Sequence, residues 1–302
     1  MQRIDLVKER PELEVAGGGG LLFDEAMVDR LIEETCEVYT PQGELLAKYL
    51  HDAFPLEMHQ LAYEALKTAA TITENRGMAG GIGETGEKQQ MRVKTDGTVS
   101  KTNMASNFVK SGIVGYFDRY VRNPYCRQTA WTMEHQDHFM AALPAIQHAS
   151  NLFREHIHER WQNQKEYVER THGEWIIPGT VFTTVTVNSN FQTAQHQDAG
   201  DLRQGFGVMC CLGHGFTGGY LLFPKYRVAF KMRPGDLILA NVHEWHCNTP
   251  IKITEAGGER LSLVLYFREN MERCGTQAEE LDFAKNRKLG DPLWQSEAPL
   301  FE

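Results

Sequence analysis

Three charge-capable side chains lie close together near the middle of the chain. Residues 196–201 read HQDAGD and follow the run TVFTTVTVN, at residues 180–188, which is rich in β-branched residues. In an extended strand, side chains two positions apart face the same way. His196 and Asp198 are therefore expected to aim an imidazole and a carboxylate at one point. A metal ion with open coordination positions needs such a fixed pair.

The third ligand must come from another strand, and the chain offers two histidines for it. His243 and His246 lie in PGDLILANVHEWHCNTPI, just after an apolar strand. Two histidines and a carboxylate on a small β-barrel form the facial triad of non-haem Fe(II) oxygenases, which leaves three positions for a cosubstrate and O₂. The zinc-protease motif does not fit, because it needs two residues between the glutamate and the second histidine and HEWH has one.

A strand with one polar face follows these histidines. ERLSLVLYFR alternates between an apolar face, Leu261, Leu263, Leu265 and Phe267, and a second face of Arg260, Ser262, Val264, Tyr266 and Arg268. Because the planar guanidinium group matches a carboxylate, Arg260 and Ser262 are expected to hold the far end of 2-oxoglutarate. Taken alone, this strand would be interpreted as an amphipathic outer strand with ordinary polar surface groups. Because the predicted triad lies beside it, we favour the interpretation that Arg260 and Ser262 form a clamp for the cosubstrate carboxylate.

Composition places the chain among ordinary soluble proteins. It has 302 residues, 41% of them hydrophobic, and a mean hydropathy of −0.43, with no apolar run long enough to span a membrane. The N-terminus has no apolar signal segment, so residence in the cytoplasm is expected. Six cysteines without a C-x-x-C pair are expected to be reduced thiols.

The charge is negative as a whole but positive over one segment. The net charge of −9 argues against a protein that coats nucleic acid. Residues 88–128 nevertheless hold eight basic groups against two acidic ones, Asp96 and Asp118. This basic segment is interpreted either as a phosphate-binding surface or as a solvated loop region with scattered charge. Its basic residues are Lys88, Arg92, Lys94, Lys101, Lys110, Arg119, Arg122 and Arg127.

The hydrophobic period divides the chain into a helical part and a strand-rich part. Helical spacing predicts helices over 24–37, 43–54, 59–72 and 138–170, with a long glycine-rich loop at 77–98. From residue 180 seven short apolar runs alternate with turns, which predicts a jelly roll or barrel. The runs are 180–188, 205–212, 218–224, 227–232, 236–242, 249–254 and 260–267.

The fold class expected is therefore α+β, with a double-stranded β-helix (jelly roll) core and an N-terminal helical layer. We expect one structural domain. It is divided along the chain into an N-terminal helical segment (1–75), substrate-side loops and helices (76–175), the catalytic core (176–275) and a C-terminal tail (276–302).

Over residues 100–275 the sequence resembles the 2-oxoglutarate- and Fe(II)-dependent dioxygenases. Within these it is most similar to the ten-eleven-translocation and J-binding-protein branch, which oxidises the 5-methyl group of DNA pyrimidines and includes phage-encoded members. The residues that carry the likeness are the triad pattern, Arg260-Leu-Ser262, and the upstream segments SGIVGYFDR and YCRQTAWT. The resemblance implies Fe(II), 2-oxoglutarate and O₂ as cofactors and DNA as the partner.

The resemblance also implies residue roles. His196 and Asp198 match the proximal metal ligands, and His246 matches the distal one because HCNTP follows the family's pattern, which leaves His243 as a neighbour. Asp201, Tyr266 and Arg268 match the positions that read and stack on the flipped base. The animal enzymes carry Asn and His where this chain has Asp201 and Arg268. Arg127, in the basic segment, is expected to bind substrate as well.

Three enzymatic functions and one non-enzymatic function are compatible with these residues. A carboxylate at Asp201 accepts from the cytosine amino group and Arg268 donates to N3 and O2, which favours hydroxylation of 5-methylcytosine in DNA. Thymine is the alternative, since its N3–H can donate to Asp201. The third enzymatic function is hydroxylation of a small molecule or an amino acid. The non-enzymatic function is that of a jelly-roll binding module. The oligomeric state is open, and a phage-encoded protein would work in the host cytoplasm.

Overall fold

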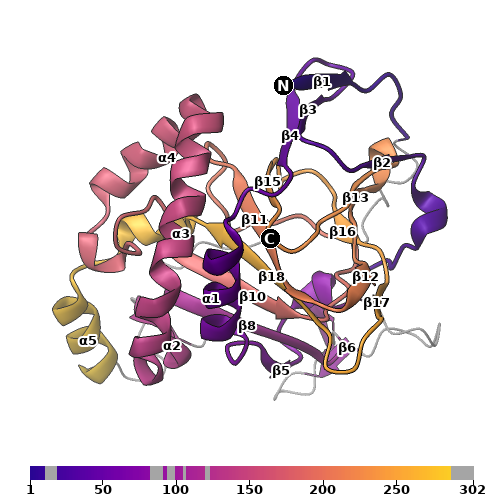
Figure 1. Cartoon of the computed structure of the whole chain (residues 1–302). Helices are drawn as coiled ribbons and strands as arrows, with labels where there is room; N and C mark the ends of the chain where they lie inside the picture. Colours follow the sequence, from indigo (N-terminus) through magenta and orange to yellow (C-terminus); the bar gives the residue numbers. More distant parts are fainter. Residues whose placement is uncertain (11–18, 82–90, 94–98, 105–106, 120–122, 287–302) are drawn as a thin grey trace. The chain divides into compact units, whose positions relative to one another are not determined.

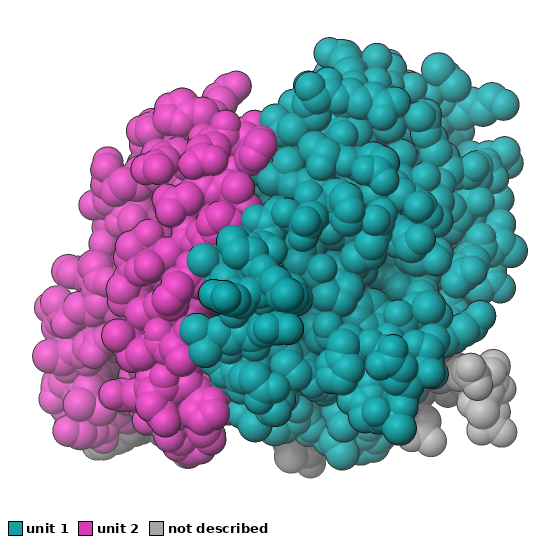
Figure 2. All heavy atoms as spheres, viewed as in Figure 1, with its two compact units in different colours: residues 1–112, 186–199, 208–264 teal, residues 113–185, 200–207, 265–302 magenta. Residues whose placement is uncertain are grey.

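The computed structural model describes residues 1–10, 19–81, 91–93, 99–104, 107–119 and 123–286. The chain forms two compact units that alternate along the sequence, coloured separately in Figure 2. Unit 1 comprises residues 1–112, 186–199 and 208–264, and unit 2 comprises residues 113–185, 200–207 and 265–302. Each unit combines distant segments, so neither is a single continuous range of the sequence.

The strands and helices are labelled in Figure 1. The strands in the first half of the described chain are β1 (Gln2–Asp5), β2 (Arg30–Ile32), β3 (Cys36–Tyr39), β4 (Leu45–Leu50), β5 (Thr71–Thr73), β6 (Met91–Val93), β7 (Val99–Met104), β8 (Val109–Phe117) and β9 (Arg127–Gln128). Those in the second half are β10 (Thr184–Ser189), β11 (Gly207–His214), β12 (Phe216–Gly218), β13 (Leu221–Phe223), β14 (Val228–Phe230), β15 (Leu237–Ala240), β16 (Cys247–Asn248), β17 (Ile251–Ile253) and β18 (Glu259–Tyr266).

Helices are concentrated between residues 130 and 170. The α-helices of the described residues are α1 (Leu56–Leu66), α2 (Ala130–Glu134), α3 (Gln136–His156), α4 (His158–Arg170) and α5 (Gln277–Asn286). The 3-10 helices are η2 (Glu25–Met27), η3 (Gly77–Gly80), η4 (Gly173–Trp175), η5 (Pro224–Tyr226) and η6 (Glu269–Arg273). None of these helices combines the length and apolarity needed to cross a membrane.

The described strands form two main sheets that pack as a sandwich. The larger sheet has the order β1-β3-β4-β15-β11-β18-β10-β8-β5, and a four-stranded sheet has the order β16-β13-β14-β2. Between them lies an apolar core that includes Tyr49 of β4, Ile238 of β15, and Phe223 and Phe230 of β13 and β14. Burying these side chains against each other is the main source of stability expected for such a sandwich.

All seven strands predicted from residue 180 onward are present, as β10, β11, β13, β14, β15, β17 and β18. The apolar face predicted for the last strand is confirmed, since Leu261, Leu263, Leu265 and Phe267 are almost completely buried. On the other face Arg260 and Tyr266 are buried as well, and Ser262 and Val264 are half-buried. The short strands β12 and β16 were not predicted, because runs of two or three residues carry no measurable period.

The N-terminal helices expected over 24–37 and 43–54 are wrong. These segments form η2, β2, β3 and β4, and among the described residues of the first quarter only α1 is an α-helix. The reason is that β4 is a central strand, paired with β3 on one side and β15 on the other, and buried on both faces. A strand buried on both faces reads as a continuous apolar run, which periodicity alone cannot distinguish from a buried helix.

Unit 2 contains the helices predicted over 138–170 and a disulfide that was not expected. In this unit α3 packs beside α4, and Phe153 of α3 stacks on Phe182 with ring centroids 6.4 Å apart. Cys126 and Cys274 form a disulfide with a Cα separation of 5.9 Å. The prediction that all six cysteines are reduced is therefore wrong for this pair, whose 148-residue separation leaves no local signal. The other four, Cys36, Cys210, Cys211 and Cys247, are free and buried.

Candidate active site

Backbone pairing brings His196 and His246 together in unit 1. The two residues form an isolated antiparallel bridge in which each N–H donates to the other's carbonyl oxygen at 3.0 Å. The N–H of Asp198 donates to Val242 O at 3.1 Å, which fixes the carboxylate-bearing residue on the same segment. His196 and Asp198 lie beyond the end of β10 rather than inside a strand, so the strand alternation assumed from the sequence is not what aligns them.

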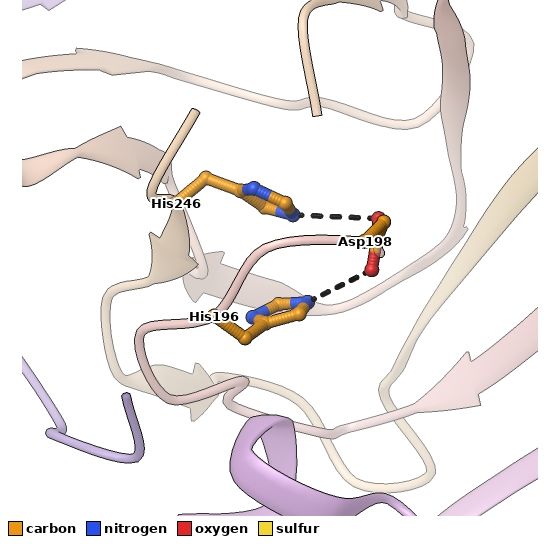
Figure 3. Close-up of side chains that lie close together, drawn as sticks. All are labelled: His196, Asp198 and His246. Carbon is orange, nitrogen blue, oxygen red and sulfur yellow. Dashed lines mark ion pairs between the residues drawn. The ribbon is translucent and has the colours of Figure 1, made fainter. Parts of the chain in front are cut away.

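The three side chains converge on one point, as Figure 3 shows. His196 Nε2 lies 3.5 Å from Asp198 Oδ1, and His246 Nε2 lies 3.6 Å from Asp198 Oδ2. Ligand atoms that share one ion at about 2.1 Å are separated by about 3 Å or slightly more. The spacing therefore fits a common metal ion. Among the described residues this is the group of histidine, cysteine or acidic side chains that could hold one.

Both imidazoles are held in the orientation that ligation requires. The carbonyl oxygens of Ala194 and Glu244 lie 2.7 and 2.9 Å from Nδ1 of His196 and His246, respectively. A carbonyl partner holds the proton on Nδ1 and leaves the Nε2 lone pair for a metal. Burial, reinforced by the neighbouring His196, lowers the pKa of His246 to about 4. His246 is therefore neutral at physiological pH, as a metal ligand must be.

His243, the other candidate for the third ligand, is not part of this group. Its neighbours are polar groups of the turn: its N–H donates to Asn241 Oδ1 at 3.2 Å, and its carbonyl oxygen accepts from the side chain of Gln197. Of the two histidines in HEWH, the geometry therefore brings His246 to Asp198.

Arg260 has the features expected of a clamp for a carboxylate. Its residue is only 3% exposed, and its Nε has no hydrogen-bond partner among the described residues. A buried donor left unpaired is costly, so a ligand that accepts a hydrogen bond from this Nε–H would be favoured here. The side chain lies against Gly219, where a Cβ would come within 2.7 Å of Arg260 Nε. Ser262 lies two residues further along β18 and is half-buried.

The residues predicted on the base side belong to unit 2. Asp201 and Arg268 form an isolated antiparallel bridge, so their backbones lie directly opposite each other. Tyr266 ends β18 and is 7% exposed. Arg127 and Arg268 both lie over the ring of Phe117, with guanidinium carbons 5.0 and 4.0 Å from its centre. Asp201, Arg268 and Arg127 are thus gathered within this unit.

Two residues of this cluster, Phe117 and Asp118, were not named as site residues from the sequence. Asp118 is 2% exposed, and its Oδ1 accepts from Arg268 Nε at 2.7 Å. The signal that could have found them is the segment YFDR itself, where an aspartate precedes an arginine at the end of an apolar strand. Much of the basic segment lies outside the described residues, including Lys88, Lys94 and Arg122.

The comparisons with known proteins fit this geometry. The family model Tet_JBP, described as the oxygenase domain of the 2OGFeDO superfamily, matches residues 112–269, more than half of the chain. The chain belongs to this family. This confirms the family expected from the sequence, and with it Fe(II), 2-oxoglutarate and O₂ as the cofactors and the dioxygenase class of oxidoreductase. The buried, unpaired Arg260 Nε and the correctly oriented histidines fit these groups.

Two curated relatives of this Tet_JBP chain carry the name Thymine dioxygenase JBP1. The protein from Leishmania infantum is 31% identical over 243 residues, which cover 79% of this chain and 26% of the relative. The protein from Trypanosoma brucei brucei is 37% identical over 163 residues, which cover 52% of this chain and 19% of the relative. The chain therefore spans about a quarter of these relatives or less.

A solved structure supports the fold. The structure titled "NgTET1 in complex with 5mC DNA in space group P3221" superposes with a TM-score of 0.55 and 15% identity, covering 85% of this chain and 90% of that chain. At this identity the likeness concerns the fold alone. It confirms the double-stranded β-helix core that the seven-strand pattern predicted.

Proposed function

We propose that this Tet_JBP chain hydroxylates the 5-methyl group of thymine in DNA. The observation that carries the proposal is the convergence of His196, Asp198 and His246 in a member of this family. The names of the curated relatives favour thymine, the base that the sequence analysis placed second. Because the chain corresponds to only about a quarter of those proteins, the substrate is argued from its own residues as well.

On the iron side, this chain's residues bind and orient. His196, Asp198 and His246 are proposed to hold the metal from one side and to leave three positions open. Bound Fe(II) and 2-oxoglutarate supply the activation of O₂ that hydroxylates a C–H bond and releases succinate and CO₂. Arg260 is proposed to receive the far carboxylate of 2-oxoglutarate on its unpaired Nε–H, with Ser262 beside it on the same strand face.

On the substrate side, the methyl group must leave the duplex to reach a buried metal, so the base is flipped. Tyr266 is proposed to stack on the flipped ring. The Asp201 carboxylate accepts from thymine N3–H, and Arg268 donates to O2 or O4. The same pair can accept from the cytosine amino group and donate to N3 and O2. For that reason 5-methylcytosine is the second candidate, and the acceptor-only Asp201 is the observation that favours it.

The test uses two DNA duplexes of one sequence. In the first, thymine is the only 5-methyl base; in the second, uracil replaces every thymine and 5-methylcytosine replaces cytosine. The protein is loaded with Fe(II) without oxygen and then given 2-oxoglutarate and O₂, and nucleosides are analysed by mass spectrometry. Gain of one oxygen on thymine supports the proposal. Gain on 5-methylcytosine alone supports the second candidate.

The control is the Asp198→Ala variant, which should form neither oxidised base nor succinate. If this variant released succinate at the wild-type rate, the ligand assignment would be wrong. If wild-type protein turned over 2-oxoglutarate but modified neither DNA, the substrate would be a small molecule instead, which is the remaining hydroxylase alternative.

A further inference from the structure

Arg268 is held by a buried carboxylate that no role yet explains. Asp118, at the end of β8 in unit 2, is 2% exposed, and its Oδ1 accepts from Arg268 Nε at 2.7 Å. The Arg268 side chain is 16% exposed. Burial disfavours its charged form, but the Asp118 carboxylate outweighs that effect, so the pKa of Arg268 is raised. The pair is therefore an ionised, charge-assisted hydrogen bond inside the protein.

Further contacts restrict the orientation of the Arg268 guanidinium. It lies flat against Phe117, with Cζ 4.0 Å from the ring centre, which is a cation–π distance. On another side, Nη2 and Nη1 lie 3.5 and 3.7 Å from the position that a Cβ on Gly200 would take. The backbone N–H of Arg268 donates to Thr183 Oγ1 at 3.0 Å. Nε is thus occupied, while both Nη groups form no hydrogen bond within the described residues.

The charges of the cluster balance. Arg268 is paired with Asp118, and Arg127, whose Nη1 donates to the carbonyl oxygen of Asp118 at 3.4 Å, also lies over Phe117. With Asp201 opposite Arg268, the cluster holds two cations and two carboxylates. A neutral cluster with fixed donors and acceptors suits an uncharged ring better than a phosphate, which needs net positive charge.

We propose that Asp118 is a positioning residue that sets base discrimination through Arg268. This inference rests on the proposed function, because it assumes that Arg268 reads the flipped base. By engaging Nε, Asp118 fixes the plane of the guanidinium and presents only the two Nη donors to the pyrimidine edge. A guanidinium without this partner could rotate and match the acceptors of either base, so the distinction between thymine and 5-methylcytosine would weaken.

The experiment measures kcat and KM for the two duplexes described above with wild type, Asp118→Asn, Arg268→Gln and the double variant. Asp118→Asn should lower kcat/KM for the preferred base about 10- to 100-fold, mainly through KM, and move the ratio between the two bases toward one. Because Asp118 acts through Arg268, adding Asp118→Asn to Arg268→Gln should cause no further loss. The double variant also removes both charges, which leaves no unpaired ion if the single variant folds poorly.

Glu280→Gln is the matched control. Glu280 is also 2% exposed and ion-paired in unit 2, but its partners are Arg119 at 2.7 Å and the backbone N–H groups of Cys126 and Gly275, which donate to it at 2.8 and 2.9 Å. Glu280→Gln should leave the ratio between the two bases unchanged and should keep DNA-independent succinate formation at the wild-type rate. An unchanged ratio in Asp118→Asn, multiplied losses in the double variant, or an equal change in Glu280→Gln would overturn the inference. Absence of base oxidation by wild type would instead overturn the proposed function, and this inference with it.

Discussion

At the scale of single residues, the two histidines of the triad are oriented by the same local backbone arrangement. Each Nδ1 faces the carbonyl oxygen two residues earlier, Ala194 O for His196 and Glu244 O for His246. The two histidines also face each other across an antiparallel β-bridge, so the same contact between Nδ1 and a backbone carbonyl oxygen occurs on both sides of that bridge. Holding the two imidazoles by backbone carbonyl oxygens needs no further side chain.

Replacing each histidine of HEWH in turn tests the choice of the third ligand. His246→Gln should weaken Fe(II) binding by more than about 100-fold, because a direct ligand is lost. His243→Gln, its matched control three residues away, replaces a half-buried residue outside the triad and should change the Fe(II) affinity less than about threefold. Anaerobic titration with Fe(II), monitored by calorimetry, measures the Fe(II) affinity of each variant. Equal losses in the two variants would mean that the ligand assignment fails.

The clamp is tested by exchanging arginine for lysine. Lysine keeps the charge of Arg260 but lacks the planar fork and the Nε–H that now has no partner. Arg260→Lys should raise the KM for 2-oxoglutarate about 10- to 100-fold and leave Fe(II) affinity unchanged. Arg170→Lys, at an exposed ion pair with Glu272, is the control and should have no effect. A normal KM in Arg260→Lys would assign the carboxylate to another residue.

At the scale of elements, the strands that form the core of the double-stranded β-helix could be predicted and the strands that extend its sheets could not. β11, β15 and β18 are marked by turn residues on both sides and by β-branched or alternating runs. β3 and β4 join the same sheet, but the helix-like spacing of their apolar residues reflects burial on both faces of β4. Their identity is decided by pairing with β15, a long-range contact that local periodicity does not contain.

The candidate site follows the same division. His196, Asp198 and Arg260 could be proposed from their own side chains and spacing, whereas His246 is preferred to His243 in the sequence only through the family resemblance. The contact of Asp118 with Arg268 and the Cys126–Cys274 disulfide join residues 150 and 148 positions apart, and no local pattern contains either pairing, although the segment YFDR marks Asp118 itself. The position of Asp198 was expected for a partly wrong reason, since backbone pairing with Val242, not strand alternation, holds it.

A glycine in the N-terminal segment of unit 1 supports the ligand-bearing segment. Gly20 N donates to Gln195 O at 2.7 Å, and Gln195 N donates to Leu21 O at 2.8 Å, directly beside His196. A Cβ at Gly19 would come within 2.7 Å of Met78 Sδ, 2.8 Å of Gln195 O and 2.9 Å of Trp245 Cζ3. Gln195 and Trp245 are sequence neighbours of the proposed metal ligands His196 and His246, so this contact would displace the proposed site.

Gly19→Ala should therefore lower the free energy of unfolding by about 1–3 kcal/mol through overpacking and weaken Fe(II) binding about tenfold. Chemical denaturation and anaerobic Fe(II) titration measure the two effects. Gly173→Ala is the control, because a Cβ there meets nothing within 4 Å. If Gly19→Ala bound Fe(II) as tightly as wild type, the N-terminal segment would have no part in holding the ligands.

At the scale of the whole molecule, a net charge of −9 means that the proposed attraction to DNA must come from a local surface. Each phosphate neutralised contributes about −0.9 to the slope of log K against log salt, so the eight basic residues of the basic segment allow a slope no steeper than about −7.

Lys110→Gln, which replaces an exposed residue of the basic segment, should make this slope shallower by about 0.9. Lys165→Gln, on α4 and paired with Glu169, should leave it unchanged. Fluorescence anisotropy with a labelled duplex at several salt concentrations measures these slopes. A slope near zero in wild type would show that no phosphates are bound and would favour a free small molecule over DNA, whereas equal changes in both variants would move the DNA-binding surface away from residues 88–128.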